Sequence, residues 1–558
     1  MDSAERLTGR AARLLAATLC GALCLAFFFR GQIGNGFTLL LGDRHDGVIA
    51  LSILEHWYNV LRGLEPWDRT AYFWPVPGTL GYNDGYLLFG LIHAGFRAAG
   101  LDPFLSGELV NVATRALGFA ATLLLGRRAL GLPFGWALLG AALFTISNNL
   151  FIRASHVQLF SVSFVPVLGL LAHGALRALW EGRRTALLGW GAGFGLWFAA
   201  MLLTGFYMAW YSAFLGGALL LAWLAVAGAG ARRHLLAAVR AQWLPLAGVL
   251  MLAAAANLPF LGLYLPKAAE TGMHPWTDVI RNAPEPIDLI HVGQHNLLWG
   301  WLVRALNDAF RPGFPDWSER MTGLPPLLLA SYLAALAWLA RGPALAPAWL
   351  TPGRLALLRA LGLASLLTWL LTLQVGGVTA WSLVYQYVPG GKAPRVVARY
   401  QLFITLAVIV LAMAFLAARR WPRPVTAALV ALLLLEQANG YAPLFLDRPL
   451  ENGRLAAVPP PPPGCRAFYV SAARTESRFG EAVADPYNHN TEAMIVAGVW
   501  HIPTVNGIST FNPPGWPDGI PEDPGYLPAV EAYAKAWGVT GLCALDLRRF
   551  RWSGPEER

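Results

Sequence analysis

The fold class is decided by the stretch LLAATLCGALCLAFFF, residues 14–29, which contains no charged side chain. A membrane-crossing helix takes about 20 mainly apolar residues, so this run with its flanks is long enough to be one. Arg6, Arg10 and Arg13 precede it, and no convincing small-x-small cleavage site follows, so we expect an uncleaved signal anchor. Similar apolar runs recur along the chain, which predicts an all-α polytopic membrane protein.

The composition supports this fold class. Of the 558 residues, 56% are hydrophobic and only 13% are charged, whereas soluble proteins average about 25% charged residues. A net charge of +10 in a soluble domain would suggest nucleic acid as a partner. Here the arginines gather in short loops between apolar runs, which is the pattern of cytoplasmic loops in membrane proteins. We therefore expect no nucleic-acid partner.

The apolar runs and the basic loops together predict the topology. The run 85–100 is short and broken by His93 and Arg97; if it does not cross, every arginine-rich loop lies on the same side as the N-terminus. We therefore expect 85–100 to be interfacial or re-entrant, with about eleven spans, the N-terminus inside and the C-terminus outside. The expected spans are 12–30, 105–125, 133–151, 157–176, 186–205, 207–228, 243–264, 324–340, 355–374, 400–418 and 424–442.

This topology divides the chain into a transmembrane region, 1–443, and a soluble C-terminal domain, 444–558. The loops 31–84, 265–322 and 375–399 share the outer face with that domain. Within the domain, a stiff run of prolines is followed by two strand-like runs and a helical stretch, which predicts a small α/β fold. Cys465 and Cys543 lie in this part and could pair only in an oxidising compartment.

The first outer loop carries a cluster of ionisable side chains, Gly42-Asp43-Arg44-His45-Asp46-Gly47. Such groups are costly beside a membrane, so their clustering suggests chemistry. If a helix begins here, the two carboxylates lie about one turn apart and could share a proton, a cation or a substrate hydroxyl. The alternative is that Asp43 only caps the helix that follows.

Three further groups on the outer face supply the other candidates. Asp84 lies before Gly85, where a turn or cap is an equal alternative. Arg153 and His156 lie in RASHVQ, residues 153–158; the first could instead contact lipid headgroups and the second could be structural.

The third group is Lys392, Arg395 and Arg399 in KAPRVVARY, residues 392–400. Three cations in a short outer loop oppose the usual charge bias, so we expect an anion there. Arg395 and Arg399 would share one helix face, suited to bidentate contact with phosphate. For metals, His291 and His295 have the spacing of a zinc pair but no third ligand nearby, so no metal site is expected there.

The layout resembles the GT-C superfamily, multispan glycosyltransferases that use polyprenyl-phosphate-linked sugars. The resemblance rests on the acidic motif at 42–46, on residues 109–128 and 131–149 with RASHVQ, and on a soluble C-terminal domain at the outer face. The sequence is most similar to the bacterial branch of YfhO-like proteins, through RASHVQ, KAPRVVARY and WHIPTVNGISTFNPPGW (500–516). The chain departs from the oligosaccharyltransferase subgroup: it has no WWD-type triplet, and His156 stands where a metal-binding Asp would be. A divalent cation thus stays possible but not established.

The resemblance implies a transferase at the outer, periplasmic face of a bacterial inner membrane. A first-loop Asp, Asp43 or Asp46, would act as general base on an acceptor hydroxyl of a glycan, lipid or protein. Attack would invert the anomeric carbon and release a lipid phosphate, held by Lys392, Arg395 and Arg399 with help from Arg153. His45, His156 and Asp84 are expected to bind the substrates.

Two other classes of function remain open. A transporter or flippase of lipid-linked glycans would need charged side chains inside the spans, which the sequence nearly lacks. A non-enzymatic scaffold would make the acidic loop only a cap. The transferase hypothesis requires Asp43, Asp84, His156 and Arg399 to converge beneath the C-terminal domain, and the scaffold hypothesis does not.

Overall fold

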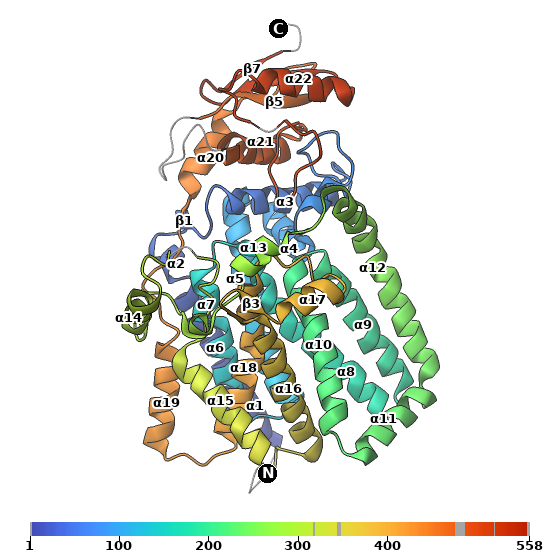
Figure 1. Ribbon diagram of the computed structural model, residues 1–558, viewed down its shortest axis with the longest axis vertical. Helices are drawn as coiled ribbons and strands as arrows, with labels where there is room; N and C mark the ends of the chain where they lie inside the picture. The colour runs from blue at the N-terminus through green and yellow to red at the C-terminus, as the bar shows by residue number, and fades with distance from the viewer. Residues whose placement is uncertain (1–2, 316–317, 343–346, 475–485, 518, 555–558) are drawn as a thin grey trace.

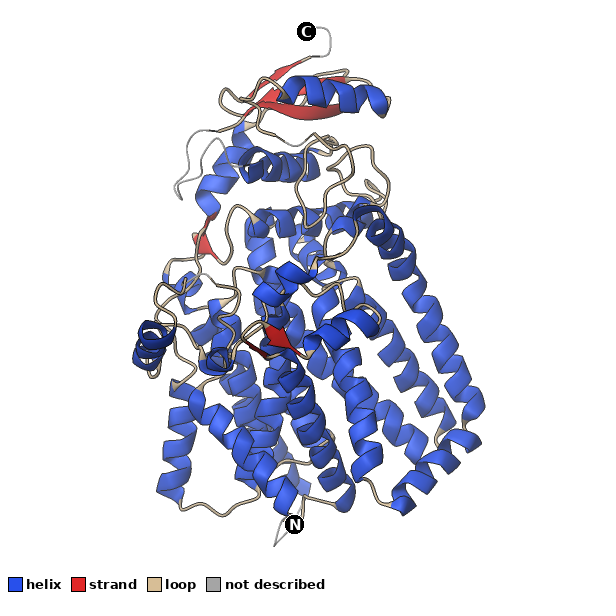
Figure 2. Ribbon diagram, in the orientation of Figure 1, coloured by secondary structure: helices blue, strands red, loops and turns tan. Residues whose placement is uncertain are grey.

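The computed structural model describes residues 3–315, 318–342, 347–474, 486–517 and 519–554. A bundle of long helices forms one layer, and a small domain is stacked on one end of it (Figure 1). The N-terminus lies at the opposite end of the bundle from that domain. Helices dominate, and the described strands are short pairs and one small sheet (Figure 2).

Nine helices in the described ranges are long and apolar enough to cross a membrane. The chain is therefore a multi-pass membrane protein, and each of these helices overlaps a predicted span. They are Gly9–Phe28 within α1 (Ser3–Phe28), α5 (Pro103–Arg128), α6 and α7 (Phe134–Thr145, Asn148–Ile152), η2 and α8 (Val157–Phe164, Val165–Trp180), α9 (Arg184–Leu202), α10 (Phe206–Val226), α12 (Trp243–Thr271), α16 (Pro352–Thr372), and η4 and α18 (Val397–Arg399, Tyr400–Ala417).

The two remaining predicted spans are shorter helices, α15 (Pro326–Arg341) and α19 (Arg423–Leu435). The predicted span 424–442 is too long, because the helix ends before Glu436. The carboxylate of Glu436 is fully buried and accepts the backbone N–H groups of Leu327 and Leu328, both at 2.9 Å. It thereby satisfies the free donors at the start of α15 and ties the two short helices together.

The ambiguous run 85–100 forms α4 (Leu87–Ala98), 12 residues long. At about 1.5 Å per residue it reaches roughly 18 Å, well short of a bilayer core of about 30 Å. Glu55 of α3 (Asp46–Leu61) holds it in place: one carboxylate oxygen contacts His93 and Arg97, each at 2.7 Å. The short length and this contact with an outer-loop helix support a segment that does not cross.

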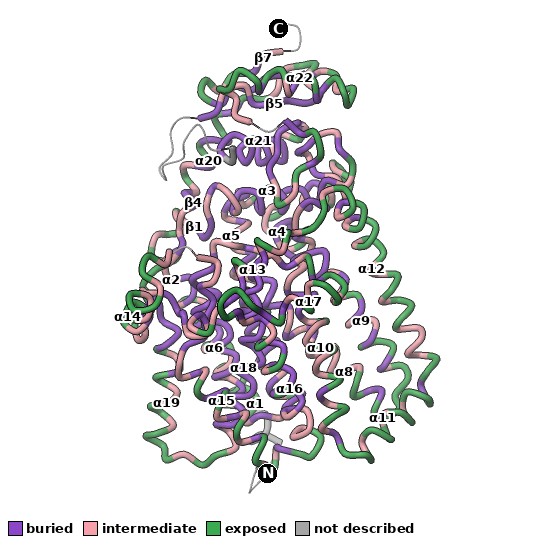
Figure 3. The backbone as a smooth tube through the Cα atoms, viewed as in Figure 1, coloured by how far each residue is buried: buried purple, intermediate pink, exposed green. Residues whose placement is uncertain are grey.

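Helix α18 lies at the centre of the bundle and is buried along nearly all of its length, whereas α12 lies at the edge and is mostly exposed (Figure 3). Arg399 directly precedes α18. The start of the central helix therefore places this arginine at the end of the bundle that lies nearer the C-terminal domain.

The arginine-rich segments gather at the other end. Figure 1 shows α11 (Ala229–Ala241) and the link from α18 to α19 at the same end of the bundle as the N-terminus. The positions agree with the predicted topology, and the assignment of this end to the cytoplasm stays a prediction.

The expectation of spans nearly free of buried charge is wrong for α5. Glu108 accepts a hydrogen bond from Gln32 at 2.7 Å, and Arg115 donates to Ser163 Oγ at 3.0 Å and to the carbonyl of Thr145 at 3.2 Å. Both side chains are buried and satisfied by neighbouring segments, so they brace the helix packing.

The outer layer contains many short elements. They are α2 (Arg30–Gly34), β1 (Leu39–Leu40), α3, η1 (Thr79–Tyr82), α13 (Trp276–Arg281), η3 (Pro286–Ile290), α14 (Gly300–Phe310), the β2–β3 hairpin (Gln374–Val375, Val378–Thr379), α17 (Trp381–Tyr387), β4 (Leu446–Asp447), α20 (Arg448–Ala457), β5 (Ala467–Ala472), α21 (Pro486–Trp500), α22 (Tyr526–Ala536), β6 (Leu542–Asp546) and β7 (Arg551–Ser553).

The C-terminal part is an α/β fold, as predicted. Strand β5 pairs with β6 in parallel and β6 with β7 in antiparallel. Helices α20 and α21 were not predicted from the sequence. Cys465 and Cys543 form a disulfide, which joins the segment before β5 to β6.

This domain is joined to the first outer loop by backbone contacts. Strand β1 pairs with β4 in antiparallel. The N–H groups of Phe73 and Trp74 donate to the carbonyls of Asn506 and Thr504, at 3.0 and 2.9 Å. Asn59 of α3 donates to the carbonyl of Gly498 in α21 at 2.9 Å. The domain is therefore fastened to the same loop that carries the acidic cluster.

The disulfide makes a first prediction. A bridge between residues 78 apart removes chain entropy from the unfolded state, worth about 4 kcal/mol for a loop of this length. Replacing Cys465 and Cys543 by Ala should destabilise the C-terminal domain by an amount of this order in denaturant unfolding of the whole protein. The control is Cys20→Ala with Cys24→Ala, which removes the two free cysteines. Alkylation of Cys465 without a reductant would contradict the pairing.

Candidate active site

The two candidate bases of the first outer loop, Asp43 and Asp46, have different contacts. The carboxylate of Asp43 accepts the backbone N–H groups of His45 at 3.0 Å and Gly47 at 3.3 Å. Asp43 thus stabilises the turn that ends the loop, and α3 begins only at Asp46. The two carboxylates therefore do not lie one helical turn apart, because the helix starts after the first of them. Asp46 has no such turn contact, and its side chain is 45% exposed.

Asp46 begins a chain of charged contacts across the site. Its carboxylate lies 3.1 Å from Nδ1 of His156, and Nε2 of His156 lies 3.2 Å from the carboxylate of Glu319. The three residues come from the start of α3, from the segment between α7 and η2, and from the loop after α14. One imidazole therefore lies between two carboxylates supplied by distant parts of the chain.

Two arginines complete this cluster. Arg153 contacts Glu319 at 2.6 Å and also donates to the carbonyl of Ser318 at 3.1 Å. Arg399 contacts the other carboxylate oxygen of Glu319 at 3.0 Å. Both arginine side chains are buried. The site thus places two permanent cations beside two carboxylates.

The electrostatics follow from these contacts. Burial raises the pKa of Asp46, but the hydrogen bond with His156 and the charges of His156 and Arg399 outweigh it and hold the pKa below its ordinary value. Burial likewise raises the pKa of Glu319, and the charges of Arg399 and Arg153 lower it far more. Burial lowers the pKa of His156, but the hydrogen bonds with Asp46 and Glu319 raise it overall. Both carboxylates therefore stay ionised to lower pH than usual, and the imidazole keeps its proton to higher pH than an ordinary histidine.

Asp84 belongs to the same neighbourhood. Its carboxylate accepts the backbone N–H of Phe206 at 2.9 Å, at the start of α10. Burial raises the pKa of Asp84, while this N–H and the charge of Arg399 lower it by less. The chain can pass here only with glycine at 85, because an added Cβ would lie 2.4 Å from the carbonyl oxygen of Leu203. Asp84 therefore combines a helix-capping contact with proximity to the charged cluster.

Arg395 lies differently from the prediction. Arg395 lies outside the helical turn η4, so it and Arg399 do not share a helix face. The Tyr207 hydroxyl accepts the backbone N–H groups of Arg395 and Val396, at 2.7 and 3.2 Å, and this holds the segment in a non-helical conformation.

The side chains of Lys392 and Arg395 remain available for a ligand. Among the residues that the structure describes, neither one forms a hydrogen bond or ion pair. Lys392 is exposed, and its Nζ lies 5.6 Å from the ring centre of Tyr385.

His45 is partly buried at the residue before α3, outside the Asp46–His156–Glu319 chain. Sequence reasoning found Asp46, Asp84, Arg153, His156 and Arg399, which lie around one place, but it missed Glu319. Nothing local marks Glu319 among the acids of the loop 265–322. Its importance lies in contacts with residues that are 80 or more positions away.

The carboxylates of the charged cluster are already in contact with cationic or imidazole side chains. Both oxygens of Glu319 already face arginines. Within the described ranges, no group of three or more His, Cys, Asp or Glu side chains is arranged to hold a metal ion.

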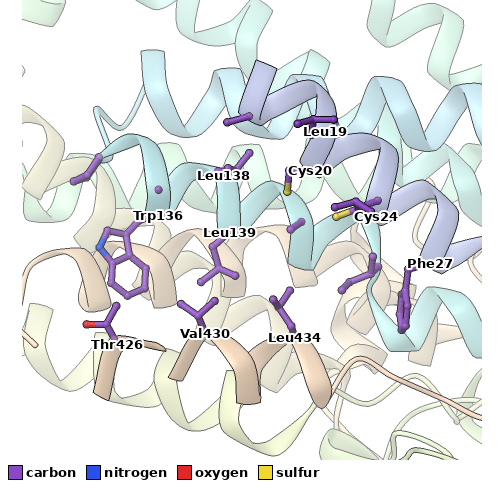
Figure 4. Close-up of a pocket in the computed structure, with 16 residues that line it drawn as sticks. Leu19, Cys20, Cys24, Phe27, Trp136, Leu138, Leu139, Thr426, Val430 and Leu434 are labelled. Carbon is purple, nitrogen blue, oxygen red and sulfur yellow. The ribbon is translucent and has the colours of Figure 1, made fainter. Parts of the chain in front are cut away.

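A cavity of about 920 Å³ lies elsewhere, between α1, α6 and α19 (Figure 4). Its lining is almost wholly apolar and includes Phe27, Trp136, Leu434 and the two free cysteines. None of the charged site residues lines it, so it is separate from the candidate active site.

Comparison of the structure, but not of the sequence, finds known proteins that are similar to this chain. No protein-family model matches the sequence, and no curated protein matches it. The structure is similar to the arabinofuranosyltransferase AftD from mycobacteria, with 15% identity and a TM-score of 0.51 over 89% of this chain and 32% of that one. This chain therefore spans about a third of the length of AftD.

Two other solved structures are similar at lower scores. The oligosaccharyltransferase of Archaeoglobus fulgidus, in complex with Zn and sulfate, has 12% identity and a TM-score of 0.49 over 94% of this chain and 67% of that one. ArnT from Cupriavidus metallidurans, bound to undecaprenyl phosphate, has 14% identity and a TM-score of 0.35 over 89% and 85% of the two chains.

Identities this low carry the fold alone. The narrower resemblance to YfhO-like proteins stays a prediction. The chain shares the fold of the arabinofuranosyltransferase AftD, which agrees with the GT-C-like fold expected from the sequence.

Proposed function

We propose that this protein is a membrane glycosyltransferase that moves a sugar from a polyprenyl-phosphate donor to an acceptor hydroxyl. The observation that carries the proposal is the convergence of Asp46, His156 and Glu319 with Arg153 and Arg399 at the outer end of the central helix. Carboxylates beside fixed cations suit a reaction that removes a proton and releases a phosphate. We infer that the reaction takes place at the outer face of a bacterial inner membrane.

In the proposed reaction, Asp46 acts as general base. Its ionised and partly exposed carboxylate accepts the acceptor hydroxyl's proton as the oxygen attacks the anomeric carbon. The new glycosidic bond forms on the face opposite the leaving group, so the configuration inverts. The bond from the anomeric carbon to the phosphate oxygen breaks, and the electron pair leaves with the lipid phosphate. His156 holds the carboxylate in position from its far side.

The departing phosphate gains negative charge, which nearby cations stabilise. We assign this role to Arg395 and Lys392, whose side chains have no acidic partner in the described ranges. The fixed charges of Arg153 and Arg399 also offer the cluster an alternative to a divalent cation. Asp84 lies at the start of α10 and is assigned to binding a sugar hydroxyl. The acceptor class, whether glycan, lipid or protein, is left to experiment.

The base assignment is tested by a matched pair of substitutions in one loop. Asp46→Asn keeps the shape and removes the base, so transfer from a panel of polyprenyl-phosphate sugars should fall by about 10²-fold or more. Asp43→Asn weakens a turn and should cost about 1 kcal/mol of stability with most of the activity retained. Loss of transfer in Asp43→Asn alone would reverse the assignment. Full activity in both variants would reject a first-loop base.

The proposed role of Lys392 and Arg395 is tested by measuring how their substitution affects use of the lipid-phosphate donor. Lys392→Ala and Arg395→Ala should each lower kcat/KM for the lipid-phosphate donor by about 10-fold, because a charge-assisted contact to the phosphate is lost. The effect should shrink as salt is raised, since these side chains are not fully buried. Arg304→Ala is the control, because Arg304 is an exposed cation of α14 that donates only to a backbone carbonyl. An equal loss in Arg304→Ala would indicate a general charge effect on donor binding.

The pH profile of transfer should show two limbs. The acid limb reports protonation of Asp46 and should lie below about 3.9, the ordinary value, because His156 and Arg399 lower that pKa. The alkaline limb reports loss of the His156 proton and should lie above about 6.5, because the two carboxylates raise that pKa. A neutral imidazole can donate a hydrogen bond to only one of the two carboxylates. His156→Asn should remove the alkaline limb, and a limb unchanged in that variant would contradict the assignment.

A further inference from the structure

Arg44 lies between the two first-loop aspartates, but its side chain enters the C-terminal domain. Nε contacts the carboxylate of Glu451 at 3.1 Å, and Nη2 contacts that of Glu492 at 3.3 Å. Nη1 approaches the amide oxygen of Asn488 at 3.5 Å. The side chains of Arg44, Glu451 and Glu492 are all at most 4% exposed. The loop that presents Asp46 is thus bound by charge to α20 and α21.

The two acids are held by further arginines of the same domain. Arg454 contacts Glu451 at 3.0 Å, and Arg474 contacts Glu492. Arg474 also donates to the backbone carbonyl of Arg454 at 3.1 Å and accepts on its own carbonyl from Asn488 at 2.9 Å. The two acids are therefore held in place by partners other than Arg44, and they define one position for its guanidinium.

A buried ionic network of this kind is poor evidence for stability, because removing charges from water costs about as much as their attraction returns. Its effect is to specify one arrangement, since a displaced Arg44 guanidinium would lose its contacts with both buried carboxylates. Arg44 is separated from Asp46 by a single residue. Two residues of chain reach at most about 7 Å, so a shift at one position is felt at the other.

We propose that Arg44 is a positioning residue, through which the C-terminal domain sets the place of the Asp46 carboxylate against His156. This inference rests on the proposed function for its effect on catalysis. The three side chains have different contacts. Asp43 closes the turn, Arg44 binds the loop to the C-terminal domain, and Asp46 faces the candidate site. The bridge between Gly42 and Leu444 lies on the same loop and holds its other end.

The test uses the full-length protein in lipid nanodiscs. Arg44→Lys keeps a charge but loses the planar fork that spans Glu451 and Glu492. Hydrogen exchange of residues 43–47 should rise at least 10-fold, because the N–H groups of His45 and Gly47 are held by Asp43 in this loop. In the transfer assay, kcat should fall at least 10-fold with KM for the donor within about 3-fold of wild type.

Glu492→Gln is the second variant, should Arg44→Lys fold poorly, and it should give the same pattern. Glu522→Gln is the matched control, because Glu522 pairs with Arg548 in the same domain and does not contact the first loop. It should leave both the exchange of 43–47 and kcat unchanged.

The outcomes separate the two proposals. Unchanged exchange of 43–47 in folded Arg44→Lys and Glu492→Gln would overturn the positioning role. Faster exchange with unchanged kcat would overturn its link to catalysis. If the wild type transfers no sugar from any donor, the proposed function fails, while the exchange result still decides whether the domain positions the loop.

Discussion

The carboxylate of Glu319 contacts Arg153 and His156 from one segment and Arg399 from another, and the geometry of the site depends on it. Arg153 and Arg399 are buried, and a buried charge is tolerated only with a partner. Because Glu319 is that partner for both, the segment after α7, the long outer loop and the start of α18 must meet at one point. His156 then connects this point to Asp46. Two oxygens thus fix the relative positions of four elements that the sequence separates widely.

The bundle provides the frame for this meeting. Apolar helices fix the outer ends of α6–α7, α10 and α18 at one level, since each must cross the same hydrocarbon layer. Polar loops begin where the helices leave that layer. Charged side chains therefore collect in a thin zone between the apolar helices and the C-terminal domain, where Arg153 and Arg399 are buried and Asp46 stays partly exposed. Such a zone would strengthen electrostatic effects on the phosphate of the proposed donor.

The C-terminal domain is part of this construction. It is fastened to the first loop by the β1–β4 pair, by backbone contacts of Phe73 and Trp74, and by the ionic network around Arg44. The same short loop thus faces the domain on one side and the membrane site on the other. A movement of α20 or α21 would be transmitted to Asp46, the proposed base, through very few bonds, which gives the domain a direct route to influence the proposed reaction.

The fold class could be predicted from the sequence alone, because the length of a hydrophobic run is a local property, and the long helices coincide with predicted spans. The sequence also assigned Asp46, Asp84, Arg153, His156 and Arg399 to the predicted outer face. Their ionisable character beside a membrane was sufficient to single them out. Only the tertiary structure decided which of them meet. It separated Asp43, which satisfies a turn, from Asp46, and it placed Arg395 outside the helix through the Tyr207 hydroxyl. It also brought in Glu319, since the pairing of buried charges depends on distances in space that no local pattern encodes.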